Sequence, residues 1–90
     1  MTLTQWEEFR AKFPNRSMRI KELGAALYTL GAQKARNDPK LDQLESLMRG
    51  LPQEGLDHFG LAPSFSKDQL LTTVFELGPR ILLNLERGGH

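Results

Sequence analysis

Residues 17–36 read SMRIKELGAALYTLGAQKAR, and the rest of the chain is organised around this stretch. At about 100° of rotation per residue it forms a helix with one narrow stripe of large apolar residues, which are Ile20, Leu23, Leu27 and Leu30. Gly24 and Gly31 lie beside this stripe, seven residues apart. Because glycine inside a helix costs about 1 kcal/mol relative to alanine, the pair favours a close approach of a second helix backbone over a helix that is merely weakened.

Lys34 interrupts the apolar stripe near its end. Either the buried part of the helix ends near Gly31, or the lysine stem extends along the surface and keeps its ammonium group in water. We expect a single helix over residues 17–36 that is covered on two sides and carries the core of the protein.

The composition is that of one small domain spanning residues 1–90. Apolar residues make up 39% of the chain and charged residues 26%, which is ordinary for a folded domain of this size. There is no cysteine, which excludes disulfides and thiolate chemistry and fits a reducing compartment. The N-terminus has no signal-peptide pattern, and the longest aliphatic run, residues 81–83, is too short to cross a membrane. We expect a soluble, cytoplasmic protein.

Start and stop signals divide the remaining sequence into further helices. Residues 3–13 carry Trp6 and two phenylalanines at helical spacing. Capping and breaking patterns follow, at Pro14, Asp38-Pro39, Gly50, Pro52, Ser66-x-x-Gln69 and Gly78-Pro79. No segment shows the sustained alternation of a strand. We predict an all-α fold, a small helical bundle of about four main helices plus one or two short helices.

The histidines do not form a catalytic arrangement. His90 is the last residue, and His58 follows Asp57 directly. Neighbouring residues on a helix point about 100° apart, so Asp57 does not orient His58 locally. No metal-ligand spacing and no glycine-rich phosphate loop occurs. We therefore predict that the protein is not an enzyme, and we assign no catalytic residue, no cofactor, no metal site and no small-molecule substrate.

Positive charge is concentrated in one part of the chain. Residues 10–36 hold seven basic residues and one acid, whereas the remainder holds five basic residues and ten acids. A basic patch for nucleic acid or an acidic partner would consist of Arg10, Lys12, Arg16, Arg19 and Lys21. The helix that starts at Pro39 is acidic at Asp42 and Glu45, which argues against reading bases. Nucleic acid is thus an alternative, bound through its phosphate backbone.

The C-terminal segment is apolar around most of its circumference. In residues 79–87 the sequence brings Ile81, Leu82, Leu83 and Leu85 close together, and on a short helix these cannot all face one small core. We predict that Leu82 and Leu83 form an interface, most simply in a symmetric dimer. The alternative is that the other helices surround this segment on all sides.

The leading prediction is a non-catalytic small helical protein-interaction module, a regulator, adaptor or minor subunit of a larger assembly. It would bind a protein partner or a second copy of itself, and no membrane. The capping and helix patterns are common to many small helical domains, so they point to no particular family.

Overall fold

Six helices and no strand make up residues 3–77, the part of the chain that this computed structural model describes. They are α1 (Leu3–Lys12), α2 (Pro14–Leu30), α3 (Ala32–Arg36), α4 (Pro39–Arg49), α5 (Gln53–His58) and α6 (Lys67–Leu77). The all-α prediction is confirmed, with α1, α2, α4 and α6 as main helices and α3 and α5 as short ones. The expected helix at residues 80–87 lies outside the described residues.

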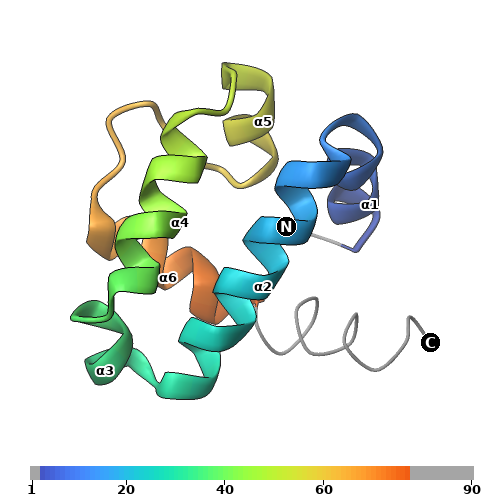
Figure 1. Cartoon of the computed structure of the whole chain (residues 1–90). Helices are drawn as coiled ribbons and strands as arrows, with labels where there is room; N and C mark the ends of the chain where they lie inside the picture. Colours follow the sequence, from blue (N-terminus) through green and yellow to red (C-terminus); the bar gives the residue numbers. More distant parts are fainter. Residues whose placement is uncertain (1–2, 78–90) are drawn as a thin grey trace.

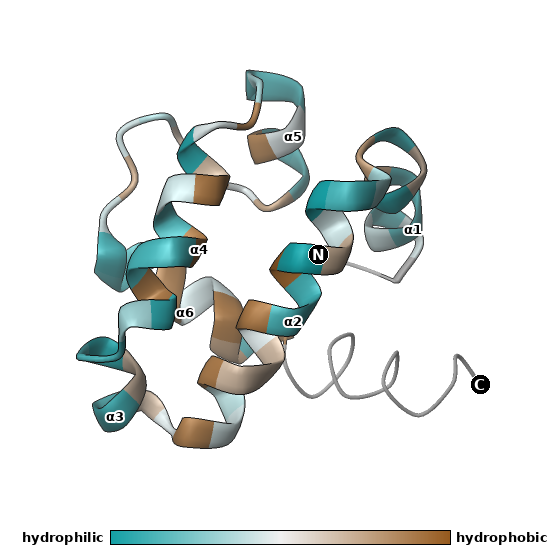
Figure 2. Cartoon of the chain, viewed as in Figure 1, coloured by the Kyte–Doolittle hydropathy of each residue, from teal (hydrophilic) through white to brown (hydrophobic). Residues whose placement is uncertain are grey.

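Helix α2 crosses the middle of the molecule and packs against α1, α4 and α6 (Figure 1). Its inward stripe is the predicted one, since Ile20, Leu23 and Leu27 are all buried. In Figure 2 the hydrophobic positions of α4 and α6 turn toward each other, and hydrophilic positions cover the outward turns. This arrangement is the usual consequence of helices that each carry one apolar stripe.

The prediction of one helix over residues 17–36 is wrong at both ends. Helix α2 begins at Pro14, which takes the first helical position, where its fixed φ and missing N–H cost nothing. It ends at Leu30 because Gly31 has φ 89° and ψ 158°, a conformation that essentially only glycine adopts. Helix α3 restarts at Ala32, and Lys34 lies exposed on it. The interrupted stripe therefore marked a break between two helices.

The two glycines of this stretch have different roles. A Cβ atom at Gly31 would meet no other atom within 4 Å, so the predicted close helix contact is wrong there. Gly24 is buried inside α2 and lines a cavity of about 10 Å³ together with Thr73, Val74 and Leu77 of α6. Gly24 thus lies on the side of α2 that faces α6.

Two predicted helix starts are confirmed by their hydrogen bonds. The backbone N–H of Lys40 donates to Asp38 Oδ1 at 2.8 Å, with Pro39 next to this N-cap. The capping box before α6 is reciprocal: Ser66 N–H donates to Gln69 Oε1 at 2.9 Å, and Gln69 N–H donates to Ser66 Oγ at 3.2 Å. Each pattern satisfies helix N–H groups that have no partner within the helix.

Arg49 attaches the loop before α6 to α4. Its Nη2 donates to the carbonyl oxygen of Phe65 at 2.8 Å and lies 3.0 Å from Glu45 Oε2. The guanidinium carbon also lies 4.3 Å from the centre of the Phe65 ring, within the range of a cation–π contact. Arg49 thus links α4 to the long connection between α5 and α6, whose own Leu61 and Phe65 are buried in the core.

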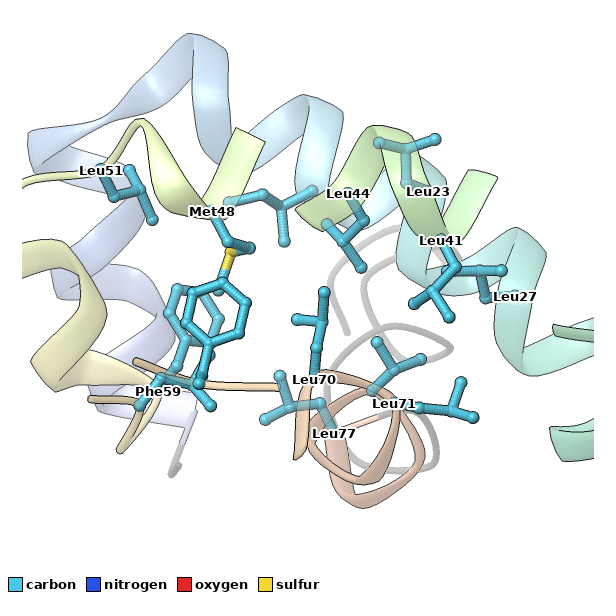
Figure 3. Packing of buried hydrophobic residues seen from close by; sticks show 14 of the residues in the cluster. Leu23, Leu27, Leu41, Leu44, Met48, Leu51, Phe59, Leu70, Leu71 and Leu77 are labelled. Atoms are coloured by element: carbon cyan, nitrogen blue, oxygen red, sulfur yellow. The ribbon is translucent and has the colours of Figure 1, made fainter. Parts of the chain in front are cut away.

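The buried core has two parts. The aromatic end consists of Trp6, Phe9 and Phe13 of the α1 region and Phe59 at the end of α5. The aliphatic centre lies between α2, α4 and α6, and its residues are Leu27, Leu41, Leu44, Leu70 and Leu71. Met48 and Phe59 line the same small cavity, where the two parts meet (Figure 3).

Candidate interaction surface

The structure divides the predicted basic patch. Lys12 at the end of α1 forms an ion pair with Glu54 of α5. The hydrogen bond and the charge of this carboxylate raise the pKa of Lys12, and the ammonium group lowers the pKa of Glu54. Arg19 Nη1 lies 3.5 Å from Glu22 Oε2, and Arg19 Nη2 donates to Gln43 Oε1 at 3.3 Å. Two of the five predicted cations thus already have partners on this chain.

The other three cations of the patch lie on different sides. Arg10 of α1 and Arg16 of α2 are exposed, and within residues 3–77 neither has an ion-pair or hydrogen-bond partner. Lys21 is half-buried. It follows Arg19 by two residues, which places the two about 160° apart around α2. Of the five predicted cations, Arg10 and Arg16 are therefore the two whose side chains are both exposed and unpaired within residues 3–77.

Met18 is a surface feature that the sequence reading missed. Its side chain is 63% exposed, and among the described residues it is the exposed large hydrophobic one. Met18 lies two residues before the buried Ile20, so it points to the far side of α2. A helical wheel contains this signal, because Met18 falls well off the apolar stripe of Ile20, Leu23 and Leu27.

A shallow depression lies on the outer face of α2, one turn beyond Met18. It is lined by Glu22, Ala25, Ala26, Thr29 and Leu30 of α2 and by Lys40 at the start of α4. Ala26 is half-buried and has a small side chain, whereas Ala25 at the edge of the depression is buried in the core. The outer face of α2, defined as Met18, Glu22, Ala26 and Thr29, thus carries one projecting apolar side chain and one hollow.

His58 packs as part of the aromatic end. It is half-buried, and its ring centre lies 5.9 Å from that of Phe9 at an interplanar angle of 66°. Asp57 accepts a hydrogen bond from Gln53 Nε2 at 2.7 Å. Asp57 and His58 thus each contact a different residue, as expected for adjacent positions on one helix.

Two further features bear on the kind of site. Within residues 3–77 no group of three or more histidine, aspartate or glutamate side chains is placed to hold a metal ion. No helix in that same range has the length and apolar character needed to cross a bilayer. The predicted interface residues Leu82 and Leu83 lie outside the described part of the chain.

Comparison with known protein families, with curated proteins and with solved structures finds no match to this chain. What the protein does must therefore be argued from its own surface.

Proposed function

We propose that this chain is a non-catalytic helical protein-interaction module, a cytoplasmic regulator, adaptor or minor subunit of a larger assembly, and that it binds through the outer face of α2. The observation that carries this proposal is the 63% exposure of Met18. Methionine and arginine are enriched at protein interfaces relative to the rest of the surface. Here Met18 is followed directly by Arg19, whose guanidinium group Glu22 and Gln43 hold in place.

The local geometry suits such a contact. Binding energy concentrates in a few anchors surrounded by polar groups that exclude water. Met18 supplies an unbranched side chain that adapts to an irregular pocket, and Arg19 and Glu22 supply a polar rim in which the two charges lie 3.5 Å apart. The absence of cysteine supports a reducing, cytoplasmic setting.

The test compares Met18→Glu with Met18→Leu as the matched control, each tagged and used to capture proteins from native lysate. Since Met18 is largely exposed, both variants should keep wild-type stability within about 0.5 kcal/mol, which circular dichroism checks. We expect Met18→Glu to lose the captured protein, because a charge replaces the apolar anchor, and Met18→Leu to retain it. Equal capture by the wild type and Met18→Glu would refute a contact at this face.

The alternative function, binding to a nucleic-acid backbone, is supported by the free charges of Arg10 and Arg16. The ion pairs of Lys12 and Arg19 work against it, because Glu54 and Glu22 bring negative charge into the same surface. A salt series of electrophoretic binding measurements separates the two functions, since phosphate contacts give a steep salt dependence. Strong binding that is lost on joint replacement of Arg10 and Arg16, but not on replacement of the exposed Lys34, would favour this alternative.

A further inference from the structure

We infer that the partner of the α2 outer face is a second copy of this chain, docked antiparallel about a twofold axis near Glu22. This inference rests on the proposed function and gives its partner. It differs from the dimer expected from the sequence, which used Leu82 and Leu83.

The projecting side chain and the hollow are spaced symmetrically along α2. Met18, Glu22 and Ala26 follow one another at intervals of four residues, so they share one face of α2. Met18 lies about 6 Å before Glu22 along the helix axis, and Ala26 lies about 6 Å after it. When a second α2 runs antiparallel with the two Glu22 positions opposite each other, Met18 of each copy faces Ala26 of the other. One symmetry operation then fills both hollows, which is what a self-complementary interface requires.

The outer face of α2 carries charges of both signs. Arg19 and Glu22 have opposite charges and lie 3.5 Å apart in one copy. Near the twofold axis each Glu22 comes within reach of the Arg19 of the other copy, so the charges of two carboxylates and two guanidinium groups offset one another. Lys40 at the edge of the hollow is paired with Asp38 of its own chain. A surface of one sign would repel its own copy instead, as the region of Arg10 and Arg16 would. The α2 outer face is thus the part of the cation-rich segment that can pair with itself.

The contact would be weak. The hollow is shallow, with Ala26 and Thr29 in its lining beside the longer side chains of Leu30 and Lys40, and the flexible side chain of Met18 can adapt to this space. One helix face supplies less than the roughly 800 Å² per partner of a standard interface. We therefore expect a weak dimer that forms reversibly at high protein concentration.

The first experiment measures mass against concentration by sedimentation velocity and light scattering. The full chain should rise from its monomer mass of 10.2 kDa toward twice that value as concentration reaches the millimolar range. Met18→Glu should weaken the association about tenfold or more, and Met18→Leu should leave it nearly unchanged. A wild type that stays monomeric at millimolar concentration overturns the inference. Association that Leu83→Glu abolishes and Met18→Glu leaves intact overturns it in favour of the C-terminal interface.

The second experiment tests the antiparallel register of the two α2 helices. Because the chain has no cysteine, no native thiol competes with the introduced ones. In the double variant Met18→Cys, Ala26→Cys the two thiols of one chain lie about 12 Å apart along α2, too far for a disulfide within that chain. Mild oxidation should therefore give a covalent dimer, faster than Thr72→Cys, an exposed position on α6 that reports random collisions. Equal rates for the two variants would contradict the antiparallel register.

The outcomes also separate this inference from the proposed function. If the protein is monomeric but Met18→Glu abolishes capture of a different protein, the interaction module stands and the second copy is the wrong partner. If Met18→Glu changes neither mass nor capture, both proposals fail.

Discussion

The aromatic end and the aliphatic centre are held together in different ways. In the aliphatic centre α2, α4 and α6 each contact the other two, which closes a triangle of helices. At the aromatic end α5 packs mainly on α1 and α1 packs on α2, while Phe59 after α5 also lines the small cavity between α2, α4 and α6. Loss of one contact in the triangle leaves two routes of support, whereas α5 has one main helix partner, α1. Stability is therefore expected to be lower at the aromatic end.

The side chains of the two parts also differ in how well their polar groups are satisfied. At the aromatic end the ring centres of Phe9 and Phe59 lie 4.9 Å apart, edge to face, a geometry worth about 0.5–1.5 kcal/mol beyond burial. The indole N–H of Trp6 is buried there without an acceptor among the described residues, and such a group costs about 1–3 kcal/mol. The leucines of the aliphatic centre have no polar side-chain atom, so they carry no such cost. The aromatic end thus combines good ring packing with an unsatisfied donor.

The largest effect should come from the aliphatic centre. Leu27 is 0% exposed, and Leu27→Ala should lower the free energy of unfolding by about 2–5 kcal/mol, a large part of the stability of so small a domain. Hydrogen exchange should show protection lost in all helices together. Leu47→Ala, at a half-buried leucine of α4, is the matched control and should cost less. A loss below about 0.5 kcal/mol for Leu27→Ala would mean that α2 is not the centre of the core.

The second effect should be local. Phe9 is also 0% exposed, and a buried Phe→Ala change usually costs about 3–5 kcal/mol. Because α1 and α5 can detach while the triangle persists, we expect Phe9→Ala to lower the global free energy of unfolding by less than Leu27→Ala does. Hydrogen exchange should speed up in α1 and α5 and stay slow in α2 and α4, with Phe9→Leu as the control. Parallel loss of protection in all helices would show that the two parts unfold as one unit.

The smallest effect concerns the ion pair that links α1 to α5. Lys12 lowers the pKa of Glu54 in the folded chain, so the stabilisation is complete above the unfolded-state pKa and is lost as the pH falls through the folded-state pKa. Glu54→Gln should slightly lower the melting temperature at neutral pH, and the difference from wild type should vanish in acid.

The matched control for this pair is Asp42→Asn, which removes the exposed pair between Asp42 of α4 and Lys67 of α6, two helices that enclose the aliphatic centre. If the aromatic end is the weaker part, Glu54→Gln should speed hydrogen exchange in α1, and Asp42→Asn should not speed it in α4 or α6. Identical local effects of the two variants would remove the distinction between the two parts.

Much of the fold was readable from local patterns. The apolar stripes of α2 and α4, the N-cap at Asp38 and the capping box of Ser66 and Gln69 appear in the structure as expected. Each depends on residues within one or two helical turns, so periodicity and capping chemistry suffice to find it. The break at Gly31 was missed because a glycine inside a helix and a glycine at a positive φ look alike in sequence.

The sequence by itself determined the helix class, the inward face of each main helix, the absence of thiol chemistry and the concentration of positive charge in residues 10–36. Only the tertiary structure decided how that charge is used. It brings Glu54 to Lys12, across 42 positions of the chain, and Gln43 to Arg19, and it leaves Met18 exposed on the outer face of α2. Helix patterns arise from neighbours along the chain, whereas ion pairs between helices and the exposure of one side chain depend on how the helices pack.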